Sequence, residues 1–264
     1  MPRSLAKEGI RRWKKQQAYV VNRVVTVMIV TVALGTYFWV PEGPVQWTAD
    51  ILFRTWVMFL GTVMAHEATH DLLGKTQRAN YFWGRLSLLP VTVPFVNFRK
   101  THRMHHAFTN DPERDPDYFV KFNSPWEMPF RALAVPHHWV MWLSARGRFN
   151  RKDKIEWVLN YVYVTLVHVW IASFVGVPRV ALGLFVPLVL VSMLLWYPFA
   201  YKTHEGHSLG ESEFRSHNYY GHVTYWFTLG LSMHRIHHEH PNFAWFEMHQ
   251  FVEENPSGFW RLSL

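Results

Sequence analysis

Histidine clusters are the residues of this 264-residue chain whose spacing best indicates chemistry. There are three: His66-Glu-Ala-Thr-His70, His102-Arg-Met-His105-His106 and His234-Arg-Ile-His237-His238. Imidazole binds zinc, copper, nickel and iron. Because a structural zinc site takes four ligands, eight histidines in repeated patterns predict a centre with two metal ions. A redox function favours iron, which can activate dioxygen.

Helix geometry indicates how each cluster divides its imidazoles. Residues three or four apart share a helix face, so His66 and His70 can hold one ion or flank a pair. In each of the other two clusters, we expect the first and second histidines to share a face. The adjacent third histidine then points to a second ion.

Two other classes of protein use part of this pattern. His66-Glu67-x-x-His70 alone matches a zinc metalloprotease motif, in which the glutamate is the general base. A membrane protease of that type has no use for two further clusters. A metal transporter needs histidines or carboxylates midway through several spans, whereas only His168 lies inside one. Both alternatives rank behind a two-metal redox enzyme.

The composition favours a membrane protein. Hydrophobic residues make up 49% of the chain and aromatic residues 17%, as suits contact with a bilayer interface. The mean hydropathy of −0.08 averages apolar spans with a polar, His-rich remainder. The net charge is +8, but the basic residues flank apolar segments instead of forming a nucleic-acid surface. The absence of cysteine excludes disulfides, thiolate ligands and a fused iron–sulfur domain.

Four apolar stretches predict an all-α membrane protein with one domain over residues 1–264. Each stretch approaches the ~20 residues that cross a bilayer, and the expected spans are about 24–40, 51–65, 157–178 and 180–201. The histidine regions, 66–156 and 202–264, then form a helical cap on one side. Arg54 is expected to snorkel at the outer end of the second span. Asn160 and His168 should face protein in the third.

Two further apolar segments do not read as spans. Tyr81 to Asn97 contains Arg85 and two prolines, which predicts a re-entrant or surface segment. Ser124 to Arg146 resembles an interfacial helix, and its tryptophans are Trp126, Trp139 and Trp142.

The distribution of Lys and Arg predicts the orientation. With four crossings, the three clusters lie on the same side as the basic N-terminus, and cytoplasmic loops carry the excess of positive charge. We therefore expect both termini and the metal site to be cytoplasmic, in a multi-pass protein of the inner (cytoplasmic) membrane. The basic residues on that side are Arg3, Lys7, Arg11, Arg12, Lys14, Lys15, Arg23, Arg99, Lys100, Arg103, Arg146, Arg148, Arg151, Lys152 and Lys154.

Several carboxylates are candidates for orienting metal-bound imidazoles, which usually need such partners. They are Glu67, Asp71, Asp111, Asp115, Asp117 and Glu239. For the three aspartates beside Pro112 and Pro116, capping of turns is an equally good interpretation. His137, His138 and His249 are expected at the interface, and His240 beside the ligands or exposed.

The clusters, their order and the four-span layout resemble the membrane fatty acid desaturase superfamily, which includes acyl desaturases, alkane monooxygenases, and carotenoid hydroxylases and ketolases. The resemblance runs from about His66 to Pro241 and is most specific from Phe98 to Phe119. There the second cluster precedes Asn110-Asp-Pro-Glu-Arg-Asp-Pro-Asp117, which is similar to carotenoid-modifying enzymes. Arg78-Ala-Asn80 and Gly84 also look like carotenoid ketolases.

The resemblance implies two irons held by the eight cluster histidines and a ninth near the cytoplasmic end of the fourth span. His204 occupies that place, with His207 and His222 as alternatives. Two features depart from the family pattern: Glu67 replaces a frequent aspartate, and Ala200 stands where some acyl desaturases carry asparagine. The implied ligands are His66, His70, His102, His105, His106, His204, His234, His237 and His238.

The resemblance also implies an oxidoreductase that uses dioxygen to desaturate or hydroxylate an unactivated C–H bond of a long-chain lipid. We favour a fatty acyl chain, the commoner substrate, over a carotenoid ring. Electrons must come from an external ferredoxin- or b-type-cytochrome-like donor, because the chain has no haem, flavin or iron–sulfur motif. The basic cytoplasmic face suits an acidic donor. Tyr81 to Asn97 and the aromatic faces of the spans are expected to form the substrate channel.

Overall fold

The structure is a computed structural model that describes residues 3–122, 124–207, 216–219 and 221–253. Side chains are described from Lys15 to Phe251, except within the gaps and at Pro125. The basic residues predicted before Lys15, and the end of the predicted region 202–264, therefore lie outside the described side chains. Every regular element in the described ranges is helical, which confirms the all-α prediction.

Four helical segments are long and apolar enough to cross a membrane, so this is an integral membrane protein. They are Lys15–Phe38, Gly43–Thr69, Arg151–Val175 and Val177–His204. The first belongs to α1 (Arg3–Gly35) and a 3-10 turn (Thr36–Phe38), the second is α2 (Gly43–Thr69), the third is α6 (Arg151–Val175), and the fourth begins with α7 (Val177–Leu194).

The second helix extends well beyond the predicted span of 51–65. Pro44 lies in its first turn, where proline is favoured because the missing N–H needs no partner. At the other end, α2 continues through His66 to Thr69. The polar ends belong to the same helix as the apolar middle, and hydropathy alone therefore underestimates its length.

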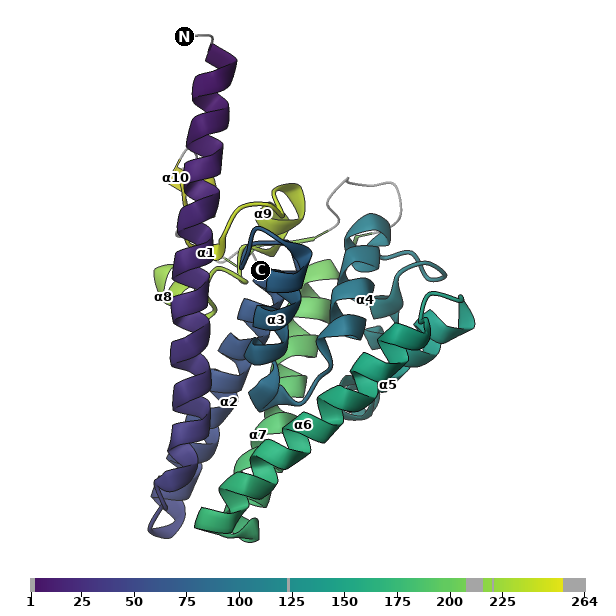
Figure 1. Ribbon diagram of the computed structural model, residues 1–264. Helices are drawn as coiled ribbons and strands as arrows, with labels where there is room; N and C mark the ends of the chain where they lie inside the picture. The colour runs from purple at the N-terminus through teal and green to yellow at the C-terminus, as the bar shows by residue number, and fades with distance from the viewer. Residues whose placement is uncertain (1–2, 123, 208–215, 220, 254–264) are drawn as a thin grey trace.

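The second helix is also the centre of the bundle, packed against α1, α3 and α7. In the most apolar part of each span, 67% of α2 residues are buried, against 22% for α6. Gly61 lets α2 approach α3 closely, since a Cβ there would lie 2.7 Å from the Ser87 carbonyl oxygen. Figure 1 shows α6 crossing diagonally at one edge, where it exposes apolar side chains.

The segment between the first two clusters folds as two helices around a buried turn. Helix α3 (Gln77–Ser87) is followed by a 3-10 turn (Leu89–Val91) and by α4 (Phe95–Phe108). Leu88, Val91 and Phe95 are buried against α2. Thr92, which follows the turn, has a left-handed backbone with φ of 62°, an uncommon conformation for a β-branched residue.

The remaining elements cover the histidine end of the bundle. They are 3-10 turns at Pro116–Val120, Pro125–Glu127 and Trp245–Glu247, and helices α5 (Met128–Ala145), α8 (His222–Phe227), α9 (His234–Glu239) and α10 (Gln250–Glu253). Helix α5 is only partly an interfacial helix. Trp126, just before it, is exposed, but Trp139 and Trp142 are buried against the rest of the protein.

The prediction for Arg54 was also wrong. Its side chain does not snorkel: it is only 2% exposed and its Nε donates to both Asp50 carboxylate oxygens at 3.0 Å. Arg179 donates to the same carboxylate at 2.6 and 3.1 Å. Asn160 and His168 are buried at 3% and 7% exposure, which confirms that they face protein.

The fourth span departs from α-helical geometry near the histidines. Leu195–Tyr201 forms a π-helical stretch containing Pro198, and Lys202–His204 then forms a 3-10 turn. The α-helix itself continues past Pro187. This irregular stretch carries His204 to the level of the other histidines.

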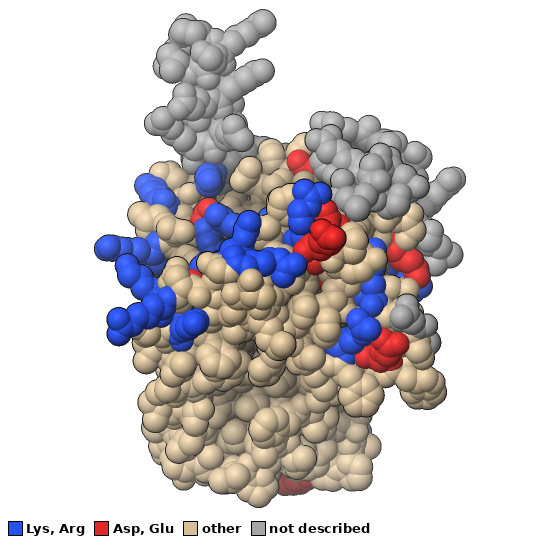
Figure 2. All heavy atoms as spheres, turned by 90° about the vertical axis from the view of Figure 1, so that its right-hand side faces the viewer, with Lys and Arg blue, Asp and Glu red and all other residues tan. Residues whose placement is uncertain are grey.

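Charged residues are concentrated at the histidine end. Figure 2 shows a face whose lower part is almost free of Lys, Arg, Asp and Glu, while the charged side chains gather above it. The uncharged band matches the part of the four spans that would lie in hydrocarbon. The histidine clusters therefore lie just beyond one edge of that band.

Candidate metal centre

Four separate elements bring the nine predicted histidines together. His66 lies in the last turn of α2 and His70 is its C-terminal cap. Helix α4 carries the second cluster and α9 the third, while His204 ends the fourth span. All nine side chains are buried or half-buried.

The ligand atoms of these histidines form two groups, within each of which all atoms lie within 4.8 Å of one another. The first group has five members: His66, His70, His102, His106 and His237. The second has four: His105, His204, His234 and His238. The groups adjoin, since the rings of His106 and His238 stack at 4.1 Å. Nine imidazoles around two centres is the arrangement that a pair of metal ions needs.

The spacing of the nitrogens within each group fits a coordination shell. Successive Nε2 atoms are separated by 2.9 to 3.2 Å, as between His70 and His102 or between His204 and His234. Two nitrogens bonded to one ion at about 2.1 Å lie about 3.0 Å apart at right angles, and about 3.4 Å apart in a tetrahedron. The buried Nε2 of His66 has no protein partner. The geometry therefore fits ions with five or six ligands.

The division of each cluster between the groups differs from the sequence prediction. His102 and His106, four apart, share a group, and so do His234 and His238. The middle histidines, His105 and His237, join the opposite group. The reason is helical: residues four apart are about 40° apart around the axis and residues three apart about 60°, with opposite sense. The prediction that the first and second histidines would share an ion was wrong.

His204 lies with the second group, whereas the two alternatives for this position do not. The ring of His207 contacts His217 at 4.3 Å, and His222 is exposed at the start of α8. Asn218, near His222, instead caps α9 by accepting from the backbone N–H groups of Arg235 and Ile236. His240 stacks on Phe251, away from both groups.

The electrostatic environment favours neutral imidazoles, the form that binds metal. Burial, followed by repulsion from neighbouring rings, holds the pKa values of six histidines well below the ordinary value; these are His70, His102, His106, His234, His237 and His238. His105 differs. Burial alone would lower its pKa, but the Asp115 carboxylate raises the pKa of His105 to about 9.

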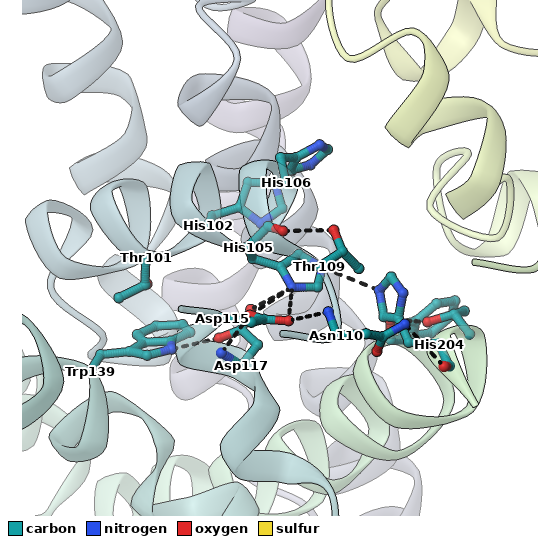
Figure 3. Close-up of polar contacts among 12 residues, drawn as sticks. Thr101, His102, His105, His106, Thr109, Asn110, Asp115, Asp117, Trp139 and His204 are labelled. Atoms are coloured by element: carbon teal, nitrogen blue, oxygen red, sulfur yellow. Dashed lines mark hydrogen bonds and ion pairs between the residues drawn. The ribbon is translucent and has the colours of Figure 1, made fainter. Parts of the chain in front are cut away.

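Asp115 and Asp117 orient the imidazole of His105 (Figure 3). The Nδ1 of His105 donates to both Asp115 oxygens at 3.1 Å, which leaves Nε2 to face His204. Asp115 also accepts from the backbone N–H groups of Asn110 and Asp117. Asp117 accepts from Trp139 Nε1 at 2.7 Å. A carboxylate fixed by the loop thus selects the ring tautomer that a metal requires.

The other candidate carboxylates do not contact the histidines. Asp111 caps its own turn, accepting from the backbone of Glu113 and Arg114. Glu239 pairs with Arg235. Glu67 is buried but its carboxylate accepts from Asn22 and from the Trp245 backbone N–H. Because Glu67 points away from both groups, the geometry does not provide the general base that a metalloprotease needs.

Arginines interspersed with the histidines of α4 hold the end of α2. Arg99 donates to the backbone oxygens of Ala68 and Thr69, and Arg103 donates to that of Thr69. Both guanidiniums also pair with Asp71 at 2.7 Å. The last carbonyls of a helix lack partners within it, and cations there are stabilising. These contacts set α2 against α4 and so fix His66 and His70 relative to the second cluster.

An apolar cavity of about 120 Å³ adjoins the histidines on the membrane side. His66, His102, His105 and His234 form one end of it. Its other lining residues are Thr62, Leu88, Val91, Val93, Phe98, Asp117, Pro136, Trp139, Ser192, Leu195, Trp196, Phe199, Ala200 and Leu231. The segment 81–97 and the aromatic side chains of the spans therefore do line a cavity, as predicted. Such a space can hold hydrocarbon directly against the metal ligands.

Comparison with known families gives a match over most of the chain. Residues 42–257 match the profile of the family described as "Fatty acid desaturase". This range contains all nine histidines and three of the four spans in full.

Individual curated proteins match over shorter stretches. The chain is 28% identical over 98 residues to "Omega-3 fatty acid desaturase fat-1" of Caenorhabditis elegans, covering 35% of this chain and 23% of the relative. It is 30% identical over 82 residues to "sn-1 acyl-lipid omega-3 desaturase (ferredoxin)" of Synechocystis sp., covering 31% and 20%. It is 27% identical over 90 residues to "sn-1 oleoyl-lipid 12-desaturase" of Picosynechococcus sp., covering 34% and 26%. The chain thus spans about a quarter of the length of these relatives.

Proposed function

Since this chain belongs to the fatty acid desaturase family, we propose that it is an oxygen-dependent, di-iron oxidoreductase acting on an acyl chain of a membrane lipid. The observation that carries the proposal is the convergence of nine histidines beside an apolar cavity. The reaction inserts a double bond or a hydroxyl group at an unactivated C–H bond. As a desaturation it consumes dioxygen, two electrons and two protons and yields the alkene and two waters.

The donor set suits iron in both groups. The proposed ligands are His66, His70, His102, His106 and His237 for one ion and His105, His204, His234 and His238 for the other. Nitrogen separations near 3.0 Å support five or six ligands, more than a closed structural zinc site takes. When bound, the two irons would supply the reductive activation of dioxygen and the oxidising power for C–H cleavage.

The protein's own contribution is to position the chain and to exclude water. Trp139, Trp196 and Phe199 line the cavity next to the histidines, where a linear hydrocarbon can lie with one segment against the metal ligands. Holding the reacting carbon close to the metal ligands makes the reaction effectively intramolecular, so the entropy cost of bringing the reactants together is met on binding. The apolar walls keep the reaction away from solvent.

The names of the relatives support an acyl chain over a carotenoid ring. All three relatives described above are named as acyl desaturases. The apolar lining of the cavity suits such a hydrocarbon chain.

The electron donor in this proposal is a ferredoxin-like protein or a b-type cytochrome. The name of the Synechocystis relative specifies ferredoxin. Around the histidine end, the side chains of Arg103, Arg114 and Arg235 are about half exposed. An acidic donor would be steered to such a surface, with an association rate that falls as salt increases.

In this proposal the histidine end and both termini lie in the cytoplasm. The positive-inside pattern supports this. Because the chain has no cysteine, single-cysteine variants test it directly. A membrane-impermeant maleimide should label Val45→Cys from outside intact cells and should label Lys154→Cys only after the cells are opened. The reverse pattern would invert the orientation.

Two measurements test the function. Elemental analysis of purified protein should give about two irons per chain, and a single zinc would refute the proposed centre.

Expression in a host rich in saturated and monounsaturated acyl lipids, followed by mass spectrometry, should give new unsaturated or hydroxylated acyl chains. His105→Ala should abolish the product, and His240→Ala, outside both groups, is the matched control. A new keto- or hydroxy-carotenoid in a carotenoid-producing host, with no acyl product, would instead favour a carotenoid hydroxylase or ketolase.

A further inference from the structure

A second cavity, distinct from the one beside the histidines, lies between α3 and α6. It measures about 350 Å³, and only Arg85 comes from α3, while the other lining residues belong to α6. Those on α6 include Lys152, Glu156, Asn160 and Tyr163. Their spacing of three to four residues places them on one stripe of the helix. The proposed oxidation makes no use of this groove.

The groove runs from the charged edge of the protein into the membrane region. Lys152 is in the first turn of the third span. Asn160 lies eight residues further along, about 12 Å along the helix axis at the rise of 1.5 Å per residue. Ile155 and Leu159 also line the groove and are 49% and 57% exposed. A ligand here would meet a cation at the headgroup level and apolar side chains below it.

At the end of the groove near Lys152, the charged side chains carry one more positive charge than negative charge. Arg85 pairs with Glu156, with nitrogen–oxygen distances of 2.8 and 2.9 Å. Lys152 is exposed, and within the described residues it forms no ion pair. The three groups sum to a single positive charge, which one phosphate diester would balance. Lys152 and Arg85, on opposite walls, can both reach such a phosphate.

The lower end offers a polar group that the protein does not use. Asn160 is 3% exposed, and its Oδ1 has no hydrogen-bond partner. Its Nδ2 makes one long contact, 3.5 Å, with the backbone oxygen of Thr92. An unpaired buried amide in hydrocarbon is unfavourable. A water molecule held between the bound lipid and the groove could pair with it, because the groove is continuous from Lys152 to Asn160.

We infer that the groove between α3 and α6 binds an anionic phospholipid of the leaflet on the histidine side, with the phosphate between Lys152 and Arg85. The acyl chains would follow Ile155 and Leu159 down the lipid-facing surface of α6. This site shares only a wall with the cavity beside the histidines: Val91 and Val93 line that cavity, and the intervening Thr92 contacts Asn160. The inference does not depend on the proposed reaction.

Native mass spectrometry of the detergent-purified, full-length protein tests the inference, with phosphatidylglycerol and phosphatidylcholine as probes. The wild type should bind phosphatidylglycerol in preference. Lys152→Gln should weaken that binding about fivefold, the effect expected for one basic residue at a membrane surface. Lys154→Gln is the matched control, because Lys154 is two residues away and points to another side of α6. It should bind like the wild type.

Three outcomes would overturn the inference. Equal binding by Lys152→Gln and Lys154→Gln would mean that the contact is not at this groove. Equal affinity for the two lipids would mean that the extra cation plays no part. Displacement of the lipid by excess inorganic phosphate would identify a simple anion site. Asn160→Leu provides a second variant, which should also weaken binding while gel filtration verifies that it is folded.

Discussion

Two buried polar clusters lie at opposite ends of the same bundle, and they are built on different principles. At the end away from the histidines, here called the outer end in contrast to the inner, histidine end, the Asp50 carboxylate lies between the guanidiniums of Arg54 and Arg179. At the inner end, imidazole nitrogens face each other at about 3 Å, and only His105 has a carboxylate partner. Both clusters involve α2 and the fourth span. In the first, the carboxylate is paired within the chain; in the second, the facing imidazole lone pairs are arranged to bind cations.

Most polar groups of the outer cluster have partners within the protein. Arg179 donates to the backbone oxygens of Thr36, Tyr37 and Trp39 besides Asp50. The guanidinium of Arg54 lies over the Tyr37 ring at 3.9 Å. Buried charges are tolerated when they are paired and hydrogen-bonded. This end should therefore be indifferent to metal, while the histidine end should depend on it.

Removing one histidine ligand should produce the largest effect. His234→Ala takes a ligand from the group of four, and metal catalysis contributes several kcal/mol. Activity should fall on the order of a thousandfold or more, with loss of about one metal ion per chain. Product analysis and elemental analysis measure the two effects. If the variant kept both metal ions and its activity, the conclusion that the histidine end depends on metal would be wrong.

Breaking the outer cluster should affect stability instead of metal content. Asp50→Asn leaves two buried guanidiniums without a counter-charge, which should cost about 3–5 kcal/mol. Thermal unfolding of the detergent-solubilised protein measures this, and Glu42→Gln, an exposed carboxylate of the same outer turn, is the control. The folded fraction should still contain its full metal complement. Metal loss from that fraction would show that the two ends are coupled.

The carboxylate beside the histidines should have an intermediate effect. Asp115→Asn keeps the shape of the side chain but removes the charge that orients His105. Loss of such a partner typically lowers metal affinity 10- to 100-fold. Competition with a chelator measures the affinity, and Asp111→Asn, whose carboxylate caps a turn, should leave it unchanged. Equal metal affinities for the Asp115→Asn and Asp111→Asn variants would show that Asp115 does not orient His105.

Replacing the exposed arginine of α4 that contacts the end of α2 should have the smallest effect. Arg103 is about half exposed and shares its partners Thr69 and Asp71 with Arg99. Arg103→Gln should therefore reduce the free energy of unfolding by less than about 1 kcal/mol. The buried Arg99→Gln variant, measured in the same unfolding experiment, should lose clearly more. The reverse ranking would mean that exposure does not govern these contacts.

The sequence predicts the helical class, the number of spans and the convergence of the clusters, because each is encoded by local spacing or by apolar runs. Positions set by tertiary partners were predicted less well. Arg54 is buried because Asp50 and the Tyr37 ring surround it. Trp139 packs with Val120 and Val135 and donates its N–H to Asp117. Asp50 lies four residues before Arg54 on the same helix, but the other partners come from separate elements and are not visible from the local pattern.

The division of the histidines shows the same limit at finer scale. The spacing leaves open whether the first histidine of a cluster shares an ion with the histidine three residues later or with the one four residues later. The answer depends on where the facing helix lies. The first and third histidines of α4, His102 and His106, belong to one group, and those of α9, His234 and His238, belong to the other. Glu67 gives a related case, since its neighbours in sequence suggest catalysis but Asn22 and Trp245 bind it.

The π-helical stretch Leu195–Tyr201 has a consequence for how the fourth span tolerates change in length. Such a stretch is commonly equivalent to one extra residue in an α-helix. Deleting a single residue there should restore regular winding without changing the register of the residues that follow, so His204 should stay with its group. A one-residue insertion or deletion in the regular helix Val177–Leu194 would instead rotate His204 by about 100° around the axis and take it out of its group, whereas substitutions of lipid-facing apolar side chains in that helix should have little effect on the site.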